Sequence, residues 1–139
     1  MALEITVEEA AASVPTSVVA LTGELDASNF TELIETGRRL HAAGTRRIVL
    51  DLAGLTFLAS SGLVALHSLI RILRGEAPPD PEEGWGALHS LEFDVSGGNA
   101  QSEVVLVAPQ PPVDRVLERT GLKRLFRVHQ DRAAGIADV

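Results

Sequence analysis

Two polar features of the sequence could belong to a functional site. One is the motif Ser60-Ser61-Gly62, at the start of an apolar-rich segment, which could accept or hold an anionic group, and the other is the acidic residue Asp26. As the N-cap of a helix, Ser60 would direct its hydroxyl at the backbone N–H of Gly62 or Leu63, and Gly62 would leave room for a larger group. Because the first amides of a helix lack intrahelical partners and carry the positive end of its dipole, a phosphate on Ser60 would be stabilised there.

Each motif also has a purely structural interpretation. Ser60 could be an ordinary serine cap worth about 1 kcal/mol. Asp26 could be the cap of a following helix, in which case its carboxylate would serve only the backbone. Residue types and spacing alone leave both interpretations open.

Apolar runs before the two motifs predict the elements that position them. Ile48, Val49, Leu50 and Leu52 form a buried strand before Ser60, and residues 61–74 form a helix after it. Residues 17–22 form a second strand, which leads to Asp26. Since both polar motifs follow the carboxyl ends of strands, a parallel arrangement of those strands would bring them to one end of the sheet.

The remaining elements complete an α/β fold. Residues 3–9 alternate as an edge strand that pairs with residues 17–22, and a helix capped by Asp26 or Ser28 ends at Gly44. Residues 104–108 form a buried strand, residues 112–120 a helix ended by Gly121, residues 125–128 a short strand and residues 132–137 a last helix capped by Asp131. The order is β-β-α-β-α-β-α-β-α, which predicts a mixed sheet of four to five strands with about four helices packed mainly on one side.

The amino-acid sequence around these motifs resembles that of the STAS family, the sulfate transporter and anti-sigma factor antagonist domains. The resemblance rests on three separated segments in the family's order: residues 21–26 (LTGELD), residues 51–63 (DLAGLTFLASSGL) and residues 113–122 (VDRVLERTGL). It covers nearly the whole chain apart from residues 75–103. We therefore expect a single STAS-like domain over residues 1–139, with an acidic insertion at 75–103.

The resemblance implies a function for the two motifs. In an anti-sigma factor antagonist, Ser60 would be the phosphorylated residue, and Asp26 would belong to the partner-binding surface. The partner would be an anti-sigma factor that is also an ATP-dependent serine kinase, and a separate serine phosphatase would restore the hydroxyl. This sequence departs from the family in one respect, because Ala59 stands where the family often has an acid before the serine.

A stripe on the helix after Ser60 could extend that surface. Val64, His67, Ser68, Arg71 and Arg74 recur at helical spacing, opposite the apolar face of that helix. The stripe is either a solvated face or a docking face beside the serine. The expected partner-binding residues are therefore Asp26, Ala59, Ser60, Ser61, Gly62, Val64, His67, Ser68 and Arg71.

Charge and composition restrict the other classes of function. The net charge of −7 opposes a nucleic-acid surface, and the absence of cysteine excludes disulfides and thiol chemistry. Residues 75–103 hold seven of the 19 acidic residues and no Lys or Arg. The other residues have 12 acids and 12 bases, so the whole net charge comes from this segment. No apolar stretch reaches membrane-spanning length and no signal pattern opens the chain, which predicts a cytoplasmic protein without a membrane partner.

The inserted segment carries predictions of its own. Its prolines, at positions 78, 79 and 81, suggest an irregular or polyproline-like stretch. Residues 88–95 alternate as a strand that could form a hairpin at the edge of the sheet, with Trp85 anchoring the loop or contacting a partner.

Catalysis is not expected from this sequence. The four histidines are scattered singly, no acid or second histidine accompanies His67 at helical spacing, and no phosphate-binding glycine loop, nucleophile elbow or metal-ligand pair occurs. We predict a phosphorylation-switched antagonist of an anti-sigma factor that needs no cofactor. The alternative is a STAS interaction module, a scaffold or sensor, that is not phosphorylated and docks through its acidic insertion.

Overall fold

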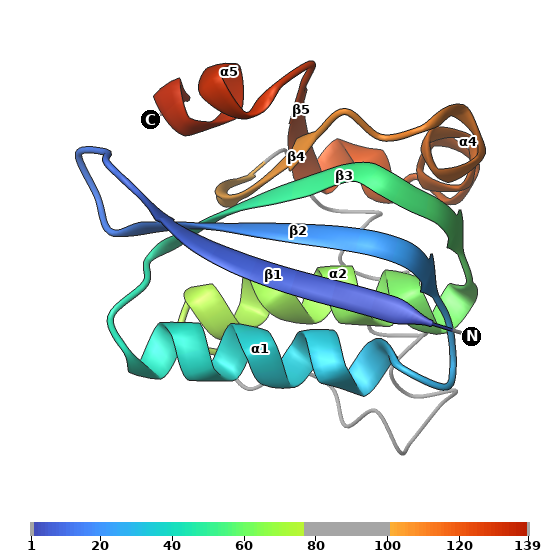
Figure 1. The fold of residues 1–139 in the computed structure, drawn as a ribbon, viewed down its shortest axis with the longest axis horizontal. Coiled ribbons are helices and arrows are strands. Elements are labelled where there is room, and N and C mark those ends of the chain that lie inside the picture. The colour runs from blue at the N-terminus through green and yellow to red at the C-terminus, as the bar shows by residue number, and fades with distance from the viewer. Residues whose placement is uncertain (1, 77–100, 139) are drawn as a thin grey trace.

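The computed structural model of the chain describes residues 2–76 and 101–138, and their elements follow the predicted order (Figure 1). The strands are β1 (Leu3–Ala10), β2 (Thr16–Leu25), β3 (Arg47–Leu58), β4 (Gln101–Val107) and β5 (Phe126–His129). The α-helices are α1 (Phe30–Ala42), α2 (Ser60–Leu73), α4 (Pro111–Thr120) and α5 (Arg132–Ala137), and a short 3₁₀ helix, η2 (Leu122–Leu125), precedes β5.

The five strands form one mixed sheet in the order β1-β2-β3-β4-β5. β1 runs antiparallel to β2, and the other neighbours are parallel. The parallel strands arise because a helix connects β2 to β3 and another connects β4 to β5, so the chain returns to the same end of the sheet before each new strand. This arrangement confirms the predicted α/β fold class.

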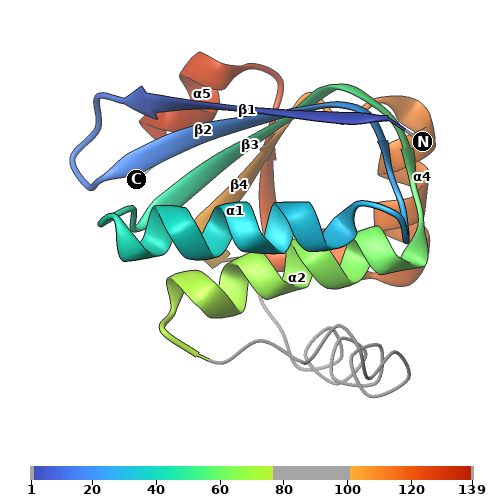
Figure 2. The same ribbon diagram turned by 60° about the horizontal axis from the view of Figure 1, so that its bottom comes forward.

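Helices cover the two faces of the sheet unequally (Figures 1 and 2). α1 and α2 lie side by side on one face, and the main core between them and the sheet includes Val113 and Leu117 of α4. α5 lies on the opposite face, over a small cluster of Val18, Val49 and Val107. Most of the helical packing is therefore on one side, as the sequence predicted.

Local capping signals decide where the C-terminal elements begin and end. Gly121 has a φ of 79°, the left-handed conformation that ends α4, and Leu122 after it is fully buried. The Asp131 carboxylate accepts a hydrogen bond of 2.8 Å from the Ala134 amide at the start of α5. Both caps were predicted from the sequence.

Several predicted boundaries differ from the structure. β3 is longer than predicted because it continues past Gly54, pairing with β2 as far as Leu58. β4 begins at Gln101, so the end of the predicted insertion at 75–103 is part of the sheet. The predicted hairpin of residues 88–95, the proline-rich stretch and the role of Trp85 lie outside the described residues.

Candidate functional site

Ser60 is the first residue of α2, and its side chain is exposed. The predicted capping role is wrong, because the N-cap is Ala59, whose backbone is extended (φ −88°, ψ 170°) and whose side chain accepts no hydrogen bond. The chain turns into the helix one residue earlier than the serine motif suggests. The Ser60 hydroxyl makes no hydrogen bond within the described part of the chain, and it is open to solvent.

Gly62 does not open the surface to a ligand, contrary to the prediction. It is buried, and a Cβ built on it would lie 2.6 Å from Cδ1 of Leu58 and 3.0 Å from Cγ of Leu25. The space that its missing side chain leaves is filled by the core. Gly62 therefore lets the first turn of α2 approach the carboxyl ends of β2 and β3 closely, which sets the position of Ser60.

Asp26 begins a tight loop between β2 and α1. Its carboxylate accepts hydrogen bonds from the backbone N–H of Ser28, at 2.9 Å, and from the Ser28 hydroxyl, at 2.6 Å. The hydroxyl bond is the main reason why the pKa of Asp26 is lowered, and the backbone bond adds to it. Asp26 therefore presents an ionised carboxylate at a fixed position, but it does not cap α1, whose N-cap is Asn29.

The sequence analysis missed Asn29, which holds this loop together. Its side chain is buried, and its amide oxygen accepts a hydrogen bond of 2.9 Å from the Asp26 backbone N–H. Its amide nitrogen donates to the Glu24 carbonyl at 2.9 Å. An asparagine three residues after an acid at a strand end is a turn signal that could have indicated this role.

Backbone pairing brings the Asp26 loop and the start of α2 together. Leu25 and Leu58 are opposite each other in the parallel pair β2 and β3, and the Leu25 carbonyl accepts a hydrogen bond of 3.0 Å from the Ala59 amide. Asp26 and Ser60 each follow directly after these linked residues. The predicted neighbourhood of the two side chains at one end of the sheet is therefore present.

The predicted stripe on α2 is not exposed. Val64, His67 and Ser68 are 4%, 2% and 0% exposed, respectively, and the Ser68 hydroxyl bonds to the Val64 carbonyl within the helix at 2.7 Å. Of the five predicted residues, only Arg71 and Arg74 reach the surface, Arg71 partly. α2 packs against α1 as well as against the sheet. Between Gly62 and Leu73 the polar residues are His67, Ser68 and Arg71 alone, and so apolar a segment is typical of a helix buried on several sides. This signal was available in the sequence.

Phe57, three residues before the candidate serine, has an exposed aromatic side chain, and the sequence analysis did not identify it as a site residue. It lies near the end of β3 and is 48% exposed, whereas the next residue, Leu58, is buried. Thr56 is an extra residue in the pairing of β3 with β2, and this bulge turns Phe57 away from the core that both Leu55 and Leu58 enter. Aromatic residues are enriched at protein–protein interfaces, so Phe57 is a candidate contact for a partner.

A comparison with protein families assigns the segment that carries this site to a known family. The family model described as "Mlab, STAS domain" matches residues 9–77, a segment that contains β2, β3, α2 and the loops bearing Asp26 and Ser60. These residues belong to the STAS family.

Solved structures share the fold of this STAS domain over nearly its whole length. An anti-sigma factor antagonist from Mycobacterium paratuberculosis matches with a TM-score of 0.66 and 20% identity, over 96% of this chain and 91% of that one. The anti-sigma factor antagonist SpoIIAA in its unphosphorylated form matches with a TM-score of 0.62 and 18% identity, over 93% of this chain and 92% of that one.

A third match is SpoIIAA of Bacillus, described as a cell fate determinant and solved in its phosphorylated form. It has a TM-score of 0.55 and 18% identity, over 93% of this chain and 96% of that one. At these identities the likeness establishes the fold. Among curated proteins, none matches this sequence significantly.

The surface of the STAS domain around Ser60 presents three kinds of group. It combines the ionised Asp26 carboxylate, the Ser60 hydroxyl and the Phe57 ring. Within residues 2–76 and 101–138 there is no group of three or more side chains able to hold a metal ion. In the same part of the chain, no helix is long and apolar enough to cross a membrane.

Proposed function

We propose that this STAS domain is an anti-sigma factor antagonist whose binding is switched by phosphorylation of Ser60. With the hydroxyl free, the domain binds an anti-sigma factor of the serine-kinase ATPase type, and with the phosphate in place it releases that partner. A serine phosphatase returns the domain to its binding form. The observation that carries this proposal is the exposed Ser60 hydroxyl at the first position of α2, on the end of the sheet shared with Asp26.

The position of Ser60 favours accepting a phosphoryl group. The hydroxyl oxygen attacks the γ-phosphorus of ATP, its proton passes to a base of the kinase, and ADP leaves. The dianion formed stands at the N-terminus of a 14-residue helix, where the backbone amides at positions 60 to 62 have no intrahelical acceptors. The first turn of α2 has no acidic side chain to oppose it.

The switch works through charge and needs no rearrangement of the backbone. Phosphorylation adds about 1.5 to 2 negative charges at neutral pH. In the free domain water solvates these charges and screens them from the Asp26 carboxylate, but between two proteins both the solvation and the screening are lost. Both effects oppose binding, so the phosphorylated domain dissociates.

The proposed binding surface is smaller than the sequence alone suggested. It comprises Asp26, Phe57, Ala59, Ser60 and Ser61, all at least partly exposed at the same end of the sheet. Arg71, in the last turn of α2, is partly exposed but is separated from this surface by the buried residues between them. Gly62, Val64, His67 and Ser68 support this surface from inside, and they are not proposed to contact the partner.

Phosphorylation with a matched control tests the proposal. The domain is incubated with ATP and each candidate anti-sigma kinase, and the modified residue is located by mass spectrometry. We expect one phosphate on Ser60, none in Ser60→Ala, and normal phosphorylation of Ser13→Ala, which removes an exposed hydroxyl in the turn after β1, outside the proposed surface. Phosphorylation of Ser61 instead, or equal partner affinity before and after phosphorylation, would contradict the switch.

A second candidate function is an interaction module that is not phosphorylated. The observation that favours it is Ala59, which replaces the acid that resembling antagonists often have before the serine, together with the acidic segment of residues 75–103. In this alternative a partner binds the acidic segment. Replacing residues 77–100 by a short Gly/Ser linker would then abolish binding, whereas Ser60→Ala would leave it unchanged. In neither candidate function does the domain catalyse a reaction, bind nucleic acid or need a cofactor, and both place it in the cytoplasm.

A further inference from the structure

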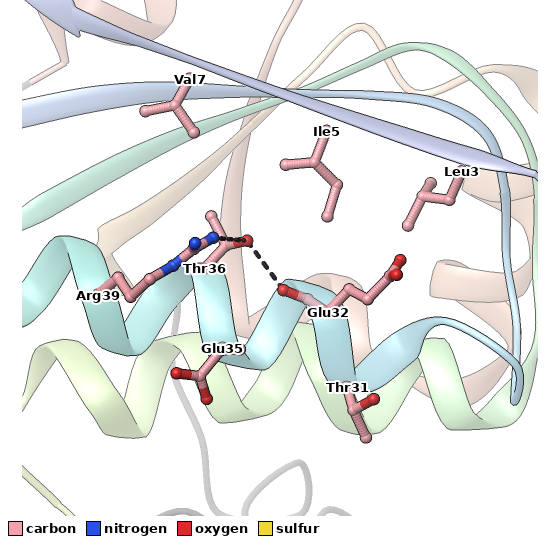
Figure 3. Close-up of a pocket in the computed structure, with 8 residues that line it drawn as sticks. All are labelled: Leu3, Ile5, Val7, Thr31, Glu32, Glu35, Thr36 and Arg39. Atoms are coloured by element: carbon pink, nitrogen blue, oxygen red, sulfur yellow. Dashed lines mark hydrogen bonds between the residues drawn. The ribbon is translucent and has the colours of Figure 1, made fainter.

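The outer edge of β1 faces an open groove above α1 (Figure 3). β1 pairs with β2 on one side only and is the first strand in the order of the sheet. The groove has a volume of about 630 Å³, and Leu3, Ile5 and Val7 of β1 line it from above. Val7 is 41% exposed, which is unusual for an apolar residue on the face of the sheet that α1 covers.

The register of β1 shows which backbone groups point outward. The Ala2 carbonyl accepts a hydrogen bond from the Glu24 amide at 3.2 Å, so Ala2 directs its polar groups at β2. Because this direction alternates along an antiparallel strand, Leu3, Ile5 and Val7 direct their N–H and C=O groups away from β2. The apolar residues of the groove thus also supply the unpaired hydrogen-bonding groups of the edge.

We propose that this edge pairs antiparallel with β1 of a second copy of the chain, about a twofold axis at Ile5. This register places Ile5 opposite Ile5 of the second copy and Leu3 opposite Val7 of the second copy. Each of these pairs exchanges backbone hydrogen bonds, and all the side chains facing the groove meet apolar ones. On the other face, Glu4 meets Thr6, so no like charges are opposed.

The neighbouring registers are worse for identifiable reasons. A twofold axis at Thr6 would place Glu4 directly opposite Glu8 of the second copy. An axis at Glu4 would place Glu4 directly opposite Glu4 of the second copy. An axis at Val7 would place Ile5 opposite Glu9 of the second copy. Like charges directly across a strand pair are destabilising, and a glutamate facing an isoleucine loses apolar burial.

Two of the three charged residues of α1 that line the groove fit the same symmetry, and the third, Glu35, lies between them along the helix. Glu32 lies at the Leu3 end of the groove and Arg39 at the Val7 end, and both are exposed (Figure 3). Since the axis at Ile5 exchanges the two ends, Arg39 of the second copy comes beside Glu32, and the reverse contact forms as well. A surface that carries opposite charges on either side of a twofold axis is complementary to itself.

Apart from its glutamates, the edge has none of the usual features that prevent strand pairing. β1 has eight residues, with no lysine, no proline and no bulge in its pairing with β2. Edge strands are normally short or carry such features because an open edge is a template for another strand. The glutamates of β1 instead constrain the register.

Cysteine crosslinking tests the register directly. The chain contains no cysteine, so a single substitution supplies the only thiol. Opposed residues of a hydrogen-bonded pair have Cα atoms about 5.5 Å apart, within the span of a disulfide. Under mild oxidation we expect Ile5→Cys to form a crosslinked dimer, and Thr6→Cys and Val14→Cys to remain largely monomeric. Crosslinking of Thr6→Cys in preference to Ile5→Cys would overturn the proposed register.

Sedimentation velocity over a range of concentrations tests the dimer itself. We expect the sedimentation coefficient to rise with concentration and Val7→Lys to weaken dimerisation by at least about tenfold, because a lysine on the edge opposes strand pairing. Val14→Lys is the matched control: Val14 is equally exposed, at 40%, but it lies in the turn after β1. A chain that stays monomeric at millimolar concentration, or a dimer unaffected by Val7→Lys, would overturn the proposal.

A charge exchange separates the proposed interface from a loss of folding. Arg39→Glu and Glu32→Arg should each weaken dimerisation, and the double variant should restore it, since each altered residue then meets the altered residue of the other copy. A double variant weaker than either single one would contradict the pairing. Ser60→Ala should not change dimerisation, so this inference and the phosphorylation switch can fail independently.

Discussion

Replacing Gly62 by alanine should destabilise the protein even though alanine favours helices. Gly62 is the third residue of α2, and a Cβ there would lie 2.6 Å from Cδ1 of Leu58 and 3.1 Å from Cδ2 of Leu25. Both leucines are buried, at 3% and 0% exposure, so neither has free space to move into. The added methyl group therefore displaces α2 from the sheet or forces the leucines into unfavourable rotamers.

Two opposing effects determine the magnitude. Overpacking a full core costs about 1 to 3 kcal/mol. Alanine recovers up to about 1 kcal/mol relative to glycine in a helix interior, and less in the first turn. We expect Gly62→Ala to lower the free energy of unfolding by about 1 to 2 kcal/mol. With a typical urea dependence, the unfolding midpoint falls by about 0.5 to 1 M.

Urea unfolding followed by circular dichroism measures this change, with Ser61→Ala as the matched control. Ser61 is the preceding residue of the same turn and is partly exposed, so its variant should stay within about 0.5 kcal/mol of the wild type. The cost of Gly62→Ala should shrink when Leu58→Ala removes the clashing methyl group. If Gly62→Ala is as stable as the wild type, α2 is not held this close to the strand ends, and the account of how Ser60 is positioned is wrong.

Three further predictions concern other parts of the chain. Phe57→Ser should weaken binding to the proposed anti-sigma partner about tenfold by calorimetry while leaving stability within about 0.5 kcal/mol, whereas Val14→Ser should change neither. The pKa of Asp138 is lowered, mainly by its 2.6 Å hydrogen bond to His129. Its contribution to the free energy of unfolding is therefore full above the ordinary pKa of 3.8 and is lost as the pH falls through the lowered value. Asp138→Asn should cost about 1 kcal/mol at pH 7 and should reduce the loss of stability at acid pH, measured by thermal unfolding. Gly121→Ala should cost about 1 kcal/mol in urea unfolding because φ is 79° there, and an unchanged midpoint would exclude that strain.

Much of the fold follows from short-range patterns in the sequence. The continuous apolar run at 48–52 and the alternation at 3–9 specify a buried strand and an edge strand because side-chain direction has a fixed period. Gly121 and Asp131 specify the end of one helix and the start of another through local backbone chemistry. These signals need no knowledge of distant residues, so the order of elements was predictable.

The packing of α5 shows what short-range patterns omit. The guanidinium of Arg47, 3% exposed at the start of β3, donates to the carbonyls of Gly135, Ile136 and Asp138 at the end of α5. Gly135 lies against Val107, where a Cβ would be 2.8 Å from Cγ2. These partners are far apart in the chain, so neither residue's own neighbourhood indicates the contact.

Some features of the candidate site also follow from neighbouring residues in the sequence, and others depend on tertiary packing. The sequence by itself determined that Ser60 stands at a strand-to-helix junction and that Asp26 ends another strand, because both facts depend on adjacent residues. Only the tertiary structure decided that Ala59 is the cap, that Gly62 faces the core and that His67 is buried. Helical periodicity specifies which residues share a face, but how many faces are covered depends on the elements that pack around the helix.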